Sequence, residues 1–348
     1  MMQRTSLIPR RRDMRISIVI NNFNYRRFVG KAIESALAQT HADVEVIVVD
    51  DGSTDGSIGE IERFASRVRL IEKKNGGQGS AYNVGYQHAS GALVFFLDAD
   101  DWLYPEAAAR VAAAWRSGVS KLQFRLEMVD HEGLPLGRQV PRHLHDREAL
   151  ALLREFGAYG SPPGSGNAYA TDFLDRVMPM DEAMWKTAAD SVPILLAPAY
   201  GEVVSLPTAL GAYRQHRPVD DGSLVSNNAP TGLWHEYDRI SWTKRFVEEC
   251  LSRLGQRPRV PQLMAPWEAR LAALCVRFGG RTAGALARPP AAQLMGFALR
   301  SVWCWPRSGI RMKSVLSIWM VGVWLLPRPW AQRLAQLHRT SIGASSVP

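Results

Sequence analysis

The sequence predicts an α/β fold with a Rossmann-like, mostly parallel sheet flanked by helices, and a helical extension at the C-terminal end. Three observations predict this class. Short β-branched runs alternate with helical segments through the first part of the chain. Two of those runs are apolar almost without interruption, as in strands buried on both faces. Acidic clusters follow the runs directly. Alternating strands and helices form parallel sheets because each helix returns the chain to the edge where the next strand starts.

The first elements alternate regularly. Ile16–Ile20 is a β-branched run, and Arg27–Gln39 has apolar residues at helical spacing. Val44–Val49 is nearly all apolar and ends in Asp50-Asp51-Gly52-Ser53-Thr54-Asp55. A helix over Ser57–Arg67 is expected to follow, because the polar turn before it offers capping side chains.

Two further strands complete the pattern. Val68–Ile71 is short, and Gly76-Gly77-Gln78-Gly79 opens a helix that reaches about Ala89. Ala92–Leu97 is a buried strand that ends at Asp98. In open parallel sheets, ligands bind outside the carboxyl ends of the strands. The polar residues that fall there are Asn21, Asn22, Asp50, Asp51, Asp98 and Asp100.

Composition excludes a disordered chain and a disulfide scaffold. Hydrophobic residues make up 46% and charged residues 22%, so a packed core is expected. The three cysteines fit no zinc motif and favour a reducing compartment. No signal-peptide pattern and no run of about 18 apolar residues occurs. We therefore expect a cytoplasmic protein without a spanning helix.

Charge divides the chain into two regions. Leu251–Pro348 contains 14 Lys and Arg residues and one acidic residue, Glu268, so its net charge is +13. Because the net charge of the whole chain is +9, the first 250 residues carry −4. Six of the eleven tryptophans also lie in this basic region. A slightly acidic body and a basic, Trp-rich tail indicate two different roles.

The cluster Asp98-Ala99-Asp100-Asp101 favours a metal site. In an extended chain Asp98 and Asp100 point to the same side. Two carboxylates on one side suit Mg²⁺ or Mn²⁺ together with phosphate oxygens. The alternative is a helix N-terminus at which acidic side chains are favourable.

The second cluster, at Asp50-Asp51, is suited to accept hydrogen bonds from a base or a ribose, or simply to cap a turn.

Several blocks, in order, resemble family 2 glycosyltransferases between about residues 15 and 217. The blocks are Ile16-Ser-Ile-Val-Ile-Asn-Asn-Phe-Asn24, Ser35-Ala-Leu-Ala-Gln-Thr40, Glu45-Val-Ile-Val-Val-Asp-Asp-Gly-Ser-Thr-Asp55, Asn83-Val-Gly85, Ala89-Ser-Gly91 and Phe96-Leu-Asp-Ala-Asp-Asp101. The resemblance implies a GT-A fold, a nucleotide-diphosphate-sugar donor (commonly a UDP-sugar), a hydroxyl acceptor and inversion at the anomeric carbon.

The resemblance also implies roles for single residues. Phe23 would pack against the base, near the backbone of Asn21 and Asn22, and Asp51 would bind the base edge. Asp98 would lie near the ribose and Asp100 would bind Mn²⁺ or Mg²⁺. Gly79 and Asn83 complete the implied donor-binding set. The family usually has Pro at the position of Asn21 or Asn22 and Tyr at that of Phe23.

The catalytic base implied by the resemblance is Asp190, because its spacing to Ala212-Tyr-Arg-Gln-His216 matches the family. The residue before it is Ala189, where the family has Glu. Asp181 and Glu182 are the competing candidates. His216 is expected to contact the metal or the diphosphate, or to be structural.

We expect a basic arm over residues 1–14, a catalytic domain over 15–232 and a basic helical region over 233–348. The catalytic domain would divide into a nucleotide-binding half, 15–104, and an acceptor-binding half, 105–232. Acceptor choice is expected in Gln123–Arg147 and Gly157–Asn167, where the resemblance is weakest. The acceptor would be a glycan or lipid-linked molecule in surface polysaccharide or glycoconjugate synthesis, which is an expectation at the level of the family.

The segment Val315–Leu326 is apolar and flanked by basic residues and tryptophans. As a helix of about 18 Å it is too short to span a bilayer, so it is suited to lie at a membrane surface. A buried helix or a dimer contact is the alternative. Nucleic-acid binding is not expected, because no known motif accompanies the basic charge.

Two other enzyme classes and one non-enzymatic function are the alternatives. A sugar nucleotidyltransferase or a dinucleotide-dependent oxidoreductase would need a glycine-rich loop after the first strand, and Asn21–Arg27 has none. A non-enzymatic alternative is a degenerate homologue that binds nucleotide or a partner without turnover, which the departure at Ala189 supports.

Overall fold

The computed structural model describes residues 14–216, 232–280, 288–306 and 308–342, and these form two compact units. The first unit is Met1–Arg147 with Ser161–Arg214, and the second is Glu148–Gly160 with Gln215–Pro348. Apart from Met14, the predicted basic arm lies outside the described residues.

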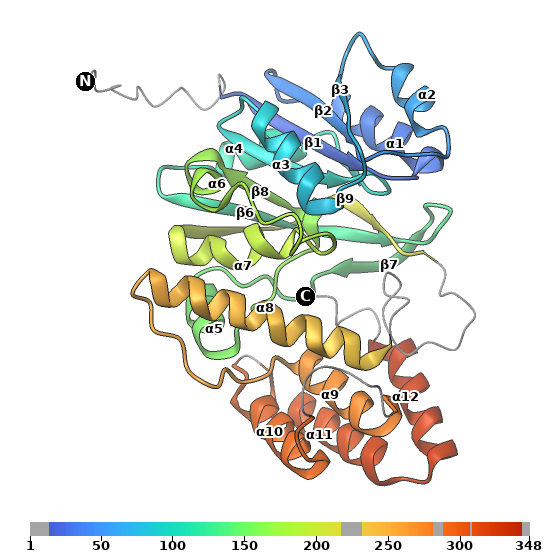
Figure 1. Cartoon of the computed structure of the whole chain (residues 1–348), viewed down its shortest axis with the longest axis vertical. Coiled ribbons are helices and arrows are strands. Elements are labelled where there is room, and N and C mark those ends of the chain that lie inside the picture. The colour runs from blue at the N-terminus through green and yellow to red at the C-terminus, as the bar shows by residue number, and fades with distance from the viewer. Residues whose placement is uncertain (1–13, 217–231, 281–287, 307, 343–348) are drawn as a thin grey trace. The chain divides into compact units, whose positions relative to one another are not determined.

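The described part of the first unit is built on a nine-stranded sheet in the order β3-β2-β1-β4-β8-β6-β9-β5, with β7 paired to β6 (Figure 1). Its strands are β1 Ile16–Asn22, β2 Val44–Asp50, β3 Arg69–Glu72, β4 Leu93–Asp98, β5 Trp102–Leu103, β6 Val119–Val129, β7 Pro135–Val140, β8 Asn167–Ala170 and β9 Glu202–Arg214. Its helices are α1 Arg26–Leu37, α2 Ser57–Glu62, α3 Gln78–His88, α4 Ala107–Ala114, the short η1 Gly164–Gly166, α6 Thr171–Val177 and α7 Ser191–Tyr200.

The sheet is parallel in its first half and mixed in its second. Strands β3, β2, β1 and β4 are all parallel, and their register sets Asn22 beside Asp50 and Asn21 beside Asp98. Strand β8 runs antiparallel to both β4 and β6. The predicted α/β class is confirmed, and the mixed half was not foreseen because four-residue β8 is too short to show a periodicity.

Close packing of α3 on the sheet explains one of the glycines. A Cβ atom at Gly85 would lie 2.3 Å from Cγ1 of Val19 in β1, so only glycine lets the helix approach this closely. Val19 and its neighbours in β1 are fully buried. The carboxyl ends of β1, β2 and β4 are therefore held by a tightly packed layer.

The second unit is helical. It contains α5 Ala149–Phe156, α8 Leu233–Arg253, α9 Pro266–Phe278, α10 Ala291–Cys304, α11 Ile310–Leu325 and α12 Arg328–Ile342. Its core includes Trp234, Ala272, Met295, Trp319 and Met320. Among the described residues, no helix is both long and apolar enough to cross a membrane. The predicted helical C-terminal region is confirmed.

Candidate active site

Three carboxylates from two distant segments meet at the end of the first, parallel half of the sheet. Asp98 ends β4, Asp100 lies in the turn after it, and Asp190 directly precedes α7. Burial, and then the charges of Asp100 and Asp190, raise the pKa of Asp98 to about 7. Because the two neighbouring charges act on Asp98, the fold brings together residues that are 90 positions apart.

Asp98 is held from three sides. Asn21 Nδ2 donates to Asp98 Oδ1 at 3.0 Å, and Gln78 Nε2 donates to the same oxygen at 3.5 Å. The backbone N–H of Asp98 donates to Ser165 Oγ at 3.1 Å. The carboxylate therefore has a set orientation before any ligand arrives.

Asp101 and Arg214 fasten the acidic turn to the end of β9. The Asp101 carboxylate accepts hydrogen bonds from Ser165 Oγ at 2.7 Å and from the Arg214 backbone N–H at 2.9 Å. Arg214 Nε donates to the Asp100 carbonyl at 3.0 Å, and its guanidinium lies 4.5 Å from the centre of the Phe28 ring. Ser165 lies in Gly157–Asn167, where acceptor choice was expected, and Arg214 lies in Ala212-Tyr-Arg-Gln-His216, but neither residue was itself predicted as a site residue.

Gln78 connects the two carboxylate segments. Its Oε1 accepts the backbone N–H of Ala189 at 2.9 Å, while its Nε2 faces Asp98. The glycines beside it allow this contact: a Cβ at Gly77 or at Gly79 would lie 2.6 Å from the carbonyl oxygen of Lys186 or of Trp185. Gly79 thus has a packing role in addition to the donor-binding role predicted for it.

The loop Ser161–Gly166 lies against Asp190. A Cβ at Gly164 would lie 3.3 Å from Asp190 Cβ and 3.2 Å from Tyr82 Oη. Asn167 Nδ2 donates to the Pro163 carbonyl at 2.9 Å, and this hydrogen bond helps to hold the loop in place. Gly164 thus leaves space beside Asp190 that a larger side chain would occupy.

A buried lysine supports the same loop. Lys121, in β6, is fully buried and its Nζ donates to Ser161 Oγ at 2.8 Å. Burial lowers the pKa of Lys121 well below its ordinary value. Its burial could not be predicted from the sequence, because a charged residue in an alternating strand normally faces solvent.

Asp51 and Phe23, which were both predicted to contact the base, differ in their burial. Asp51 is buried and accepts hydrogen bonds from Lys73 Nζ and from the backbone N–H groups of Gly76 and Gly77 at 2.9 and 2.8 Å. Phe23, by contrast, is 44% exposed. An exposed ring is available for stacking on a base, whereas Asp51 organises the loop that leads into α3.

Asn22, Asn83 and His216 are three other residues that were predicted to bind the donor or the metal. Asn22 Nδ2 donates to Asp50 Oδ2 at 2.7 Å, so its amide serves the turn after β2. Asn83 Nδ2 donates to the Met180 carbonyl at 2.8 Å, and its Oδ1 accepts the Met180 backbone N–H at 2.8 Å. His216 is partly buried and lies two residues beyond β9, at the start of the second unit.

The competing base candidates are exposed and are held by local contacts. Asp181 Oδ1 accepts the Met184 backbone N–H at 3.0 Å, and Glu182 accepts a hydrogen bond from Asn83 Nδ2 at 3.2 Å. Hydrogen bonds from Ser80 and Asn83 lower the pKa of Glu182. Neither carboxylate is among the charges that raise the pKa of Asp98.

The acidic turn suits a divalent cation that also binds a diphosphate. Within the described residues, no group of three or more His, Cys, Asp or Glu side chains is arranged to hold a metal. Mg²⁺ typically takes only one or two carboxylates, with phosphate and water oxygens completing its shell. Asn21 Oδ1 is buried with no hydrogen-bond partner in the described structure, which leaves an acceptor beside Asp98. The residues present therefore fit such an ion.

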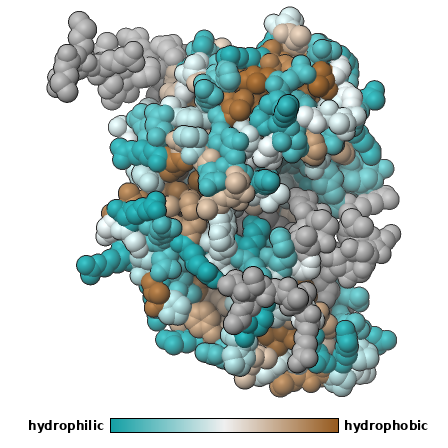
Figure 2. Space-filling model, viewed as in Figure 1, coloured by the Kyte–Doolittle hydropathy of each residue, from teal (hydrophilic) through white to brown (hydrophobic). Residues whose placement is uncertain are grey.

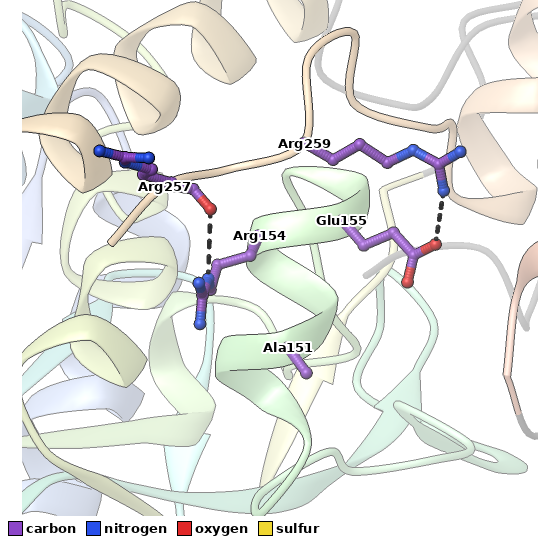
Figure 3. A pocket seen from close by; sticks show the side chains of 5 residues that line it. All are labelled: Ala151, Arg154, Glu155, Arg257 and Arg259. Atoms are coloured by element: carbon purple, nitrogen blue, oxygen red, sulfur yellow. Dashed lines mark hydrogen bonds and ion pairs between the residues drawn. The ribbon is translucent and has the colours of Figure 1, made fainter. Parts of the chain in front are cut away.

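A separate pocket lies in the second unit (Figure 3). It is lined by Ala151, Arg154, Glu155, Arg257 and Arg259. Arg259 forms an ion pair with Glu155 at 3.1 Å, and Arg154 Nε donates to the Arg257 carbonyl at 3.4 Å. These contacts fasten α5 to the segment after α8, so this pocket has a structural explanation.

Comparisons with known proteins agree with this geometry. The sequence model of Glycosyl transferase family 2 matches residues 17–139. An uncharacterized glycosyltransferase of Nostoc sp. is 34% identical over 255 residues, which cover 71% of this chain and 79% of that protein. Chondroitin synthase of Escherichia coli is 39% identical over 140 residues, but these cover only 20% of that protein.

A solved structure shares the fold. The crystal structure of S. aureus TarS 1-349 in complex with UDP-GlcNAc aligns with a TM-score of 0.51 at 17% identity, covering 96% of this chain and 93% of that one. The GT-A fold expected from the sequence is thereby confirmed. Together with the Nostoc relative, these findings show that the chain belongs to glycosyl transferase family 2.

Proposed function

We propose that this chain is an inverting, metal-dependent glycosyltransferase that moves a sugar from a nucleotide-diphosphate-sugar, most simply a UDP-sugar, to a hydroxyl acceptor. The observation that carries the proposal is that Asp190 lies beside the loop that is bonded to Asp98. Gly164 of this loop lies against the Asp190 side chain, and Ser165 accepts the Asp98 backbone N–H. Asp181 and Glu182, the other acidic residues of the same connecting segment, are held elsewhere. Asp190 is therefore the acidic residue of this segment whose charge acts on Asp98.

The chemistry is a single displacement. Asp190 accepts the proton of the acceptor hydroxyl while that oxygen forms a bond to the anomeric carbon. The bond between the anomeric carbon and the phosphate oxygen breaks, and its electron pair leaves with the nucleoside diphosphate. Attack from the face opposite the leaving group inverts the configuration. A divalent cation at Asp100, when bound, neutralises charge on the leaving diphosphate.

The remaining site residues orient these groups. Asn21 and Gln78 fix Asp98, and Arg214 fixes the turn that carries Asp100. Phe23 presents a ring for the base, and Asp98 would accept a hydrogen bond from the ribose. Because an aspartate is a weak base toward an alcohol, this positioning has to supply much of the rate enhancement.

The acceptor and the setting are also proposed. A glycan or lipid-linked acceptor and a role in polysaccharide synthesis agree with the similarity to chondroitin synthase over part of that protein. Cys250, Cys275 and Cys304 form no disulfide, which favours a cytoplasmic, reducing setting.

A second candidate is a homologue that binds the nucleotide without turnover. Buried Ala189 favours it, because this position offers only a backbone N–H, bonded to Gln78, where the family has a carboxylate.

The test is donor turnover. The full chain is incubated with a panel of UDP-, GDP- and TDP-sugars and candidate acceptors, with Mn²⁺ or with EDTA, and released nucleotide is measured. We expect metal-dependent release from one donor. Asp190→Asn should lower kcat by roughly 10²- to 10⁴-fold, and Asp181→Asn is the matched control that should leave it unchanged. Nucleotide binding by calorimetry with no release from any donor would support the second candidate instead.

A further inference from the structure

Helix α11 is apolar on both sides, but only one side is covered in the described structure. Leu316, Trp319, Met320 and Val323 pack into the core of the second unit. On the other side, Val315 is 54% exposed, Ile318 is 72% exposed and Leu325 is 66% exposed. Residues three and seven apart lie on one side of a helix, so these three form a continuous apolar stripe.

Further exposed apolar side chains extend this stripe. Trp303, in α10, donates from Nε1 to Ser317 Oγ at 3.1 Å and therefore lies beside α11. We call the surface formed by Trp303 and the exposed apolar side chains of α11 the α11 face; its members are Trp303, Ile310, Met312, Val315, Ile318 and Leu325. Brown, apolar atoms are visible at the surface of the α9–α12 region in Figure 2. A patch of this kind marks an interaction site.

The charges around the α11 face indicate which kind of partner this face would bind. No Asp or Glu follows Glu268 anywhere in the sequence. Arg311 and Lys313 lie in the first turns of α11, and Arg328 begins α12. A surface that combines an apolar stripe, flanking cations and an exposed tryptophan matches the headgroup region of an anionic bilayer.

We propose that the α11 face docks on the surface of an anionic lipid bilayer. The 16-residue helix is about 24 Å long, shorter than the roughly 30 Å hydrocarbon core, so it would lie in the interface and not across it. A second copy of the chain is disfavoured as the partner, because a two-fold contact would set cations against cations with no carboxylate to balance them. This inference goes beyond the proposed reaction and does not depend on turnover.

The test is co-sedimentation of the full chain with vesicles of phosphatidylcholine alone or mixed with phosphatidylglycerol. We expect binding to the mixed vesicles and little to the neutral ones. Ile318→Asp and Leu325→Ser should lower binding, the former by about tenfold or more. Leu134→Ser, at an apolar side chain of the first unit that is 59% exposed, is the matched control and should bind as the wild type does.

Three results would overturn the proposal. They are absence of binding to the mixed vesicles, equal binding by wild type and Ile318→Asp, and a wild-type dimer that Ile318→Asp converts to a monomer in analytical ultracentrifugation without any change in vesicle binding. An unchanged melting temperature, together with unchanged donor release where release is measurable, shows that Ile318→Asp is folded.

Discussion

In the first unit Asp50, Asp51 and Asp101 are buried, and each accepts at least two hydrogen bonds. In the second unit the cations Arg311 and Arg328 are exposed, beside apolar side chains that are exposed as well. Buried, hydrogen-bonded charge gives fixed geometry, which catalysis requires. Exposed charge next to an apolar stripe is suited to contact a surface, because such a contact does not require one fixed geometry. The two units thus use charge for different physical purposes.

The largest contrast expected between the units concerns Lys121 of the first unit, which is fully buried, and Lys244 of the second, which is partly buried. Lys244 forms an ion pair with buried Glu268, whereas burial is the cause that lowers the pKa of Lys121. Lys244→Met should destabilise the protein by about 3–5 kcal/mol because it leaves Glu268 buried and unpaired. Lys121→Met should cost less, because burial already disfavours the charged form of Lys121, although its hydrogen bond to Ser161 Oγ is lost. Urea unfolding of both variants measures the difference, and equal losses would contradict it.

The same lysine gives a pH dependence of known sign. The lowered pKa means that the folded state binds fewer protons than the unfolded state between that pKa and 10.5, so wild-type stability from this group rises with pH. The stability of Lys121→Met relative to the wild type should therefore fall as the pH rises from about 7 toward about 9.5. A constant or rising relative stability would show that Lys121 does not titrate in this range.

A next, smaller effect is expected at two glycines. Gly164→Val would place side-chain atoms against Asp190 and Tyr82, and should lower kcat/KM by about 100-fold because displacement near the reacting groups is costly. Gly296→Val, in α10 of the second unit, meets nothing within 4 Å and should leave activity unchanged. Activity at matched melting temperature is the measurement. Full activity of Gly164→Val would remove this loop from the site.

Ser165 of the first unit and Ser301 of the second, both buried, offer a further comparison between the units. Ser165→Ala removes the group that bonds both the Asp101 carboxylate and the Asp98 backbone N–H, so a loss of about 1–3 kcal/mol is expected. Ser301 donates to the Phe297 carbonyl within α10, so Ser301→Ala should cost less than about 1 kcal/mol. Thermal unfolding compares them, and a reversed order would contradict the role given to Ser165.

The smallest effect expected is at Gln78. Gln78→Leu removes the connection between Asp98 and the backbone of Ala189, and should lower kcat by about tenfold with little change in donor KM. Gln39→Leu, which removes hydrogen bonds from the turn after α1 to the Ser35 and Tyr104 carbonyls, is the comparison variant. An effect on KM alone would assign Gln78 to donor binding.

Much of the first unit's parallel sheet could be predicted from local patterns. Val44–Asp50 and Leu93–Asp98 are apolar runs that end in acids, and both are strands with those acids at their carboxyl ends. Asp98 and Asp100 became site candidates in this way, because strand ends and short-range carboxylate spacing are written in neighbouring residues.

The sequence by itself therefore determined the α/β class, the acidic turn and the apolar, basic character of residues 310–330. Only the tertiary structure decided which distant groups meet: Asp190 with Asp98, Gln78 with Ala189, Ser165 with Asp101 and Lys121 with Ser161. It also decided which side of α11 is covered. The physical reason is that periodicity and spacing record local geometry, whereas these contacts depend on strand order and loop packing, which join residues far apart in the chain.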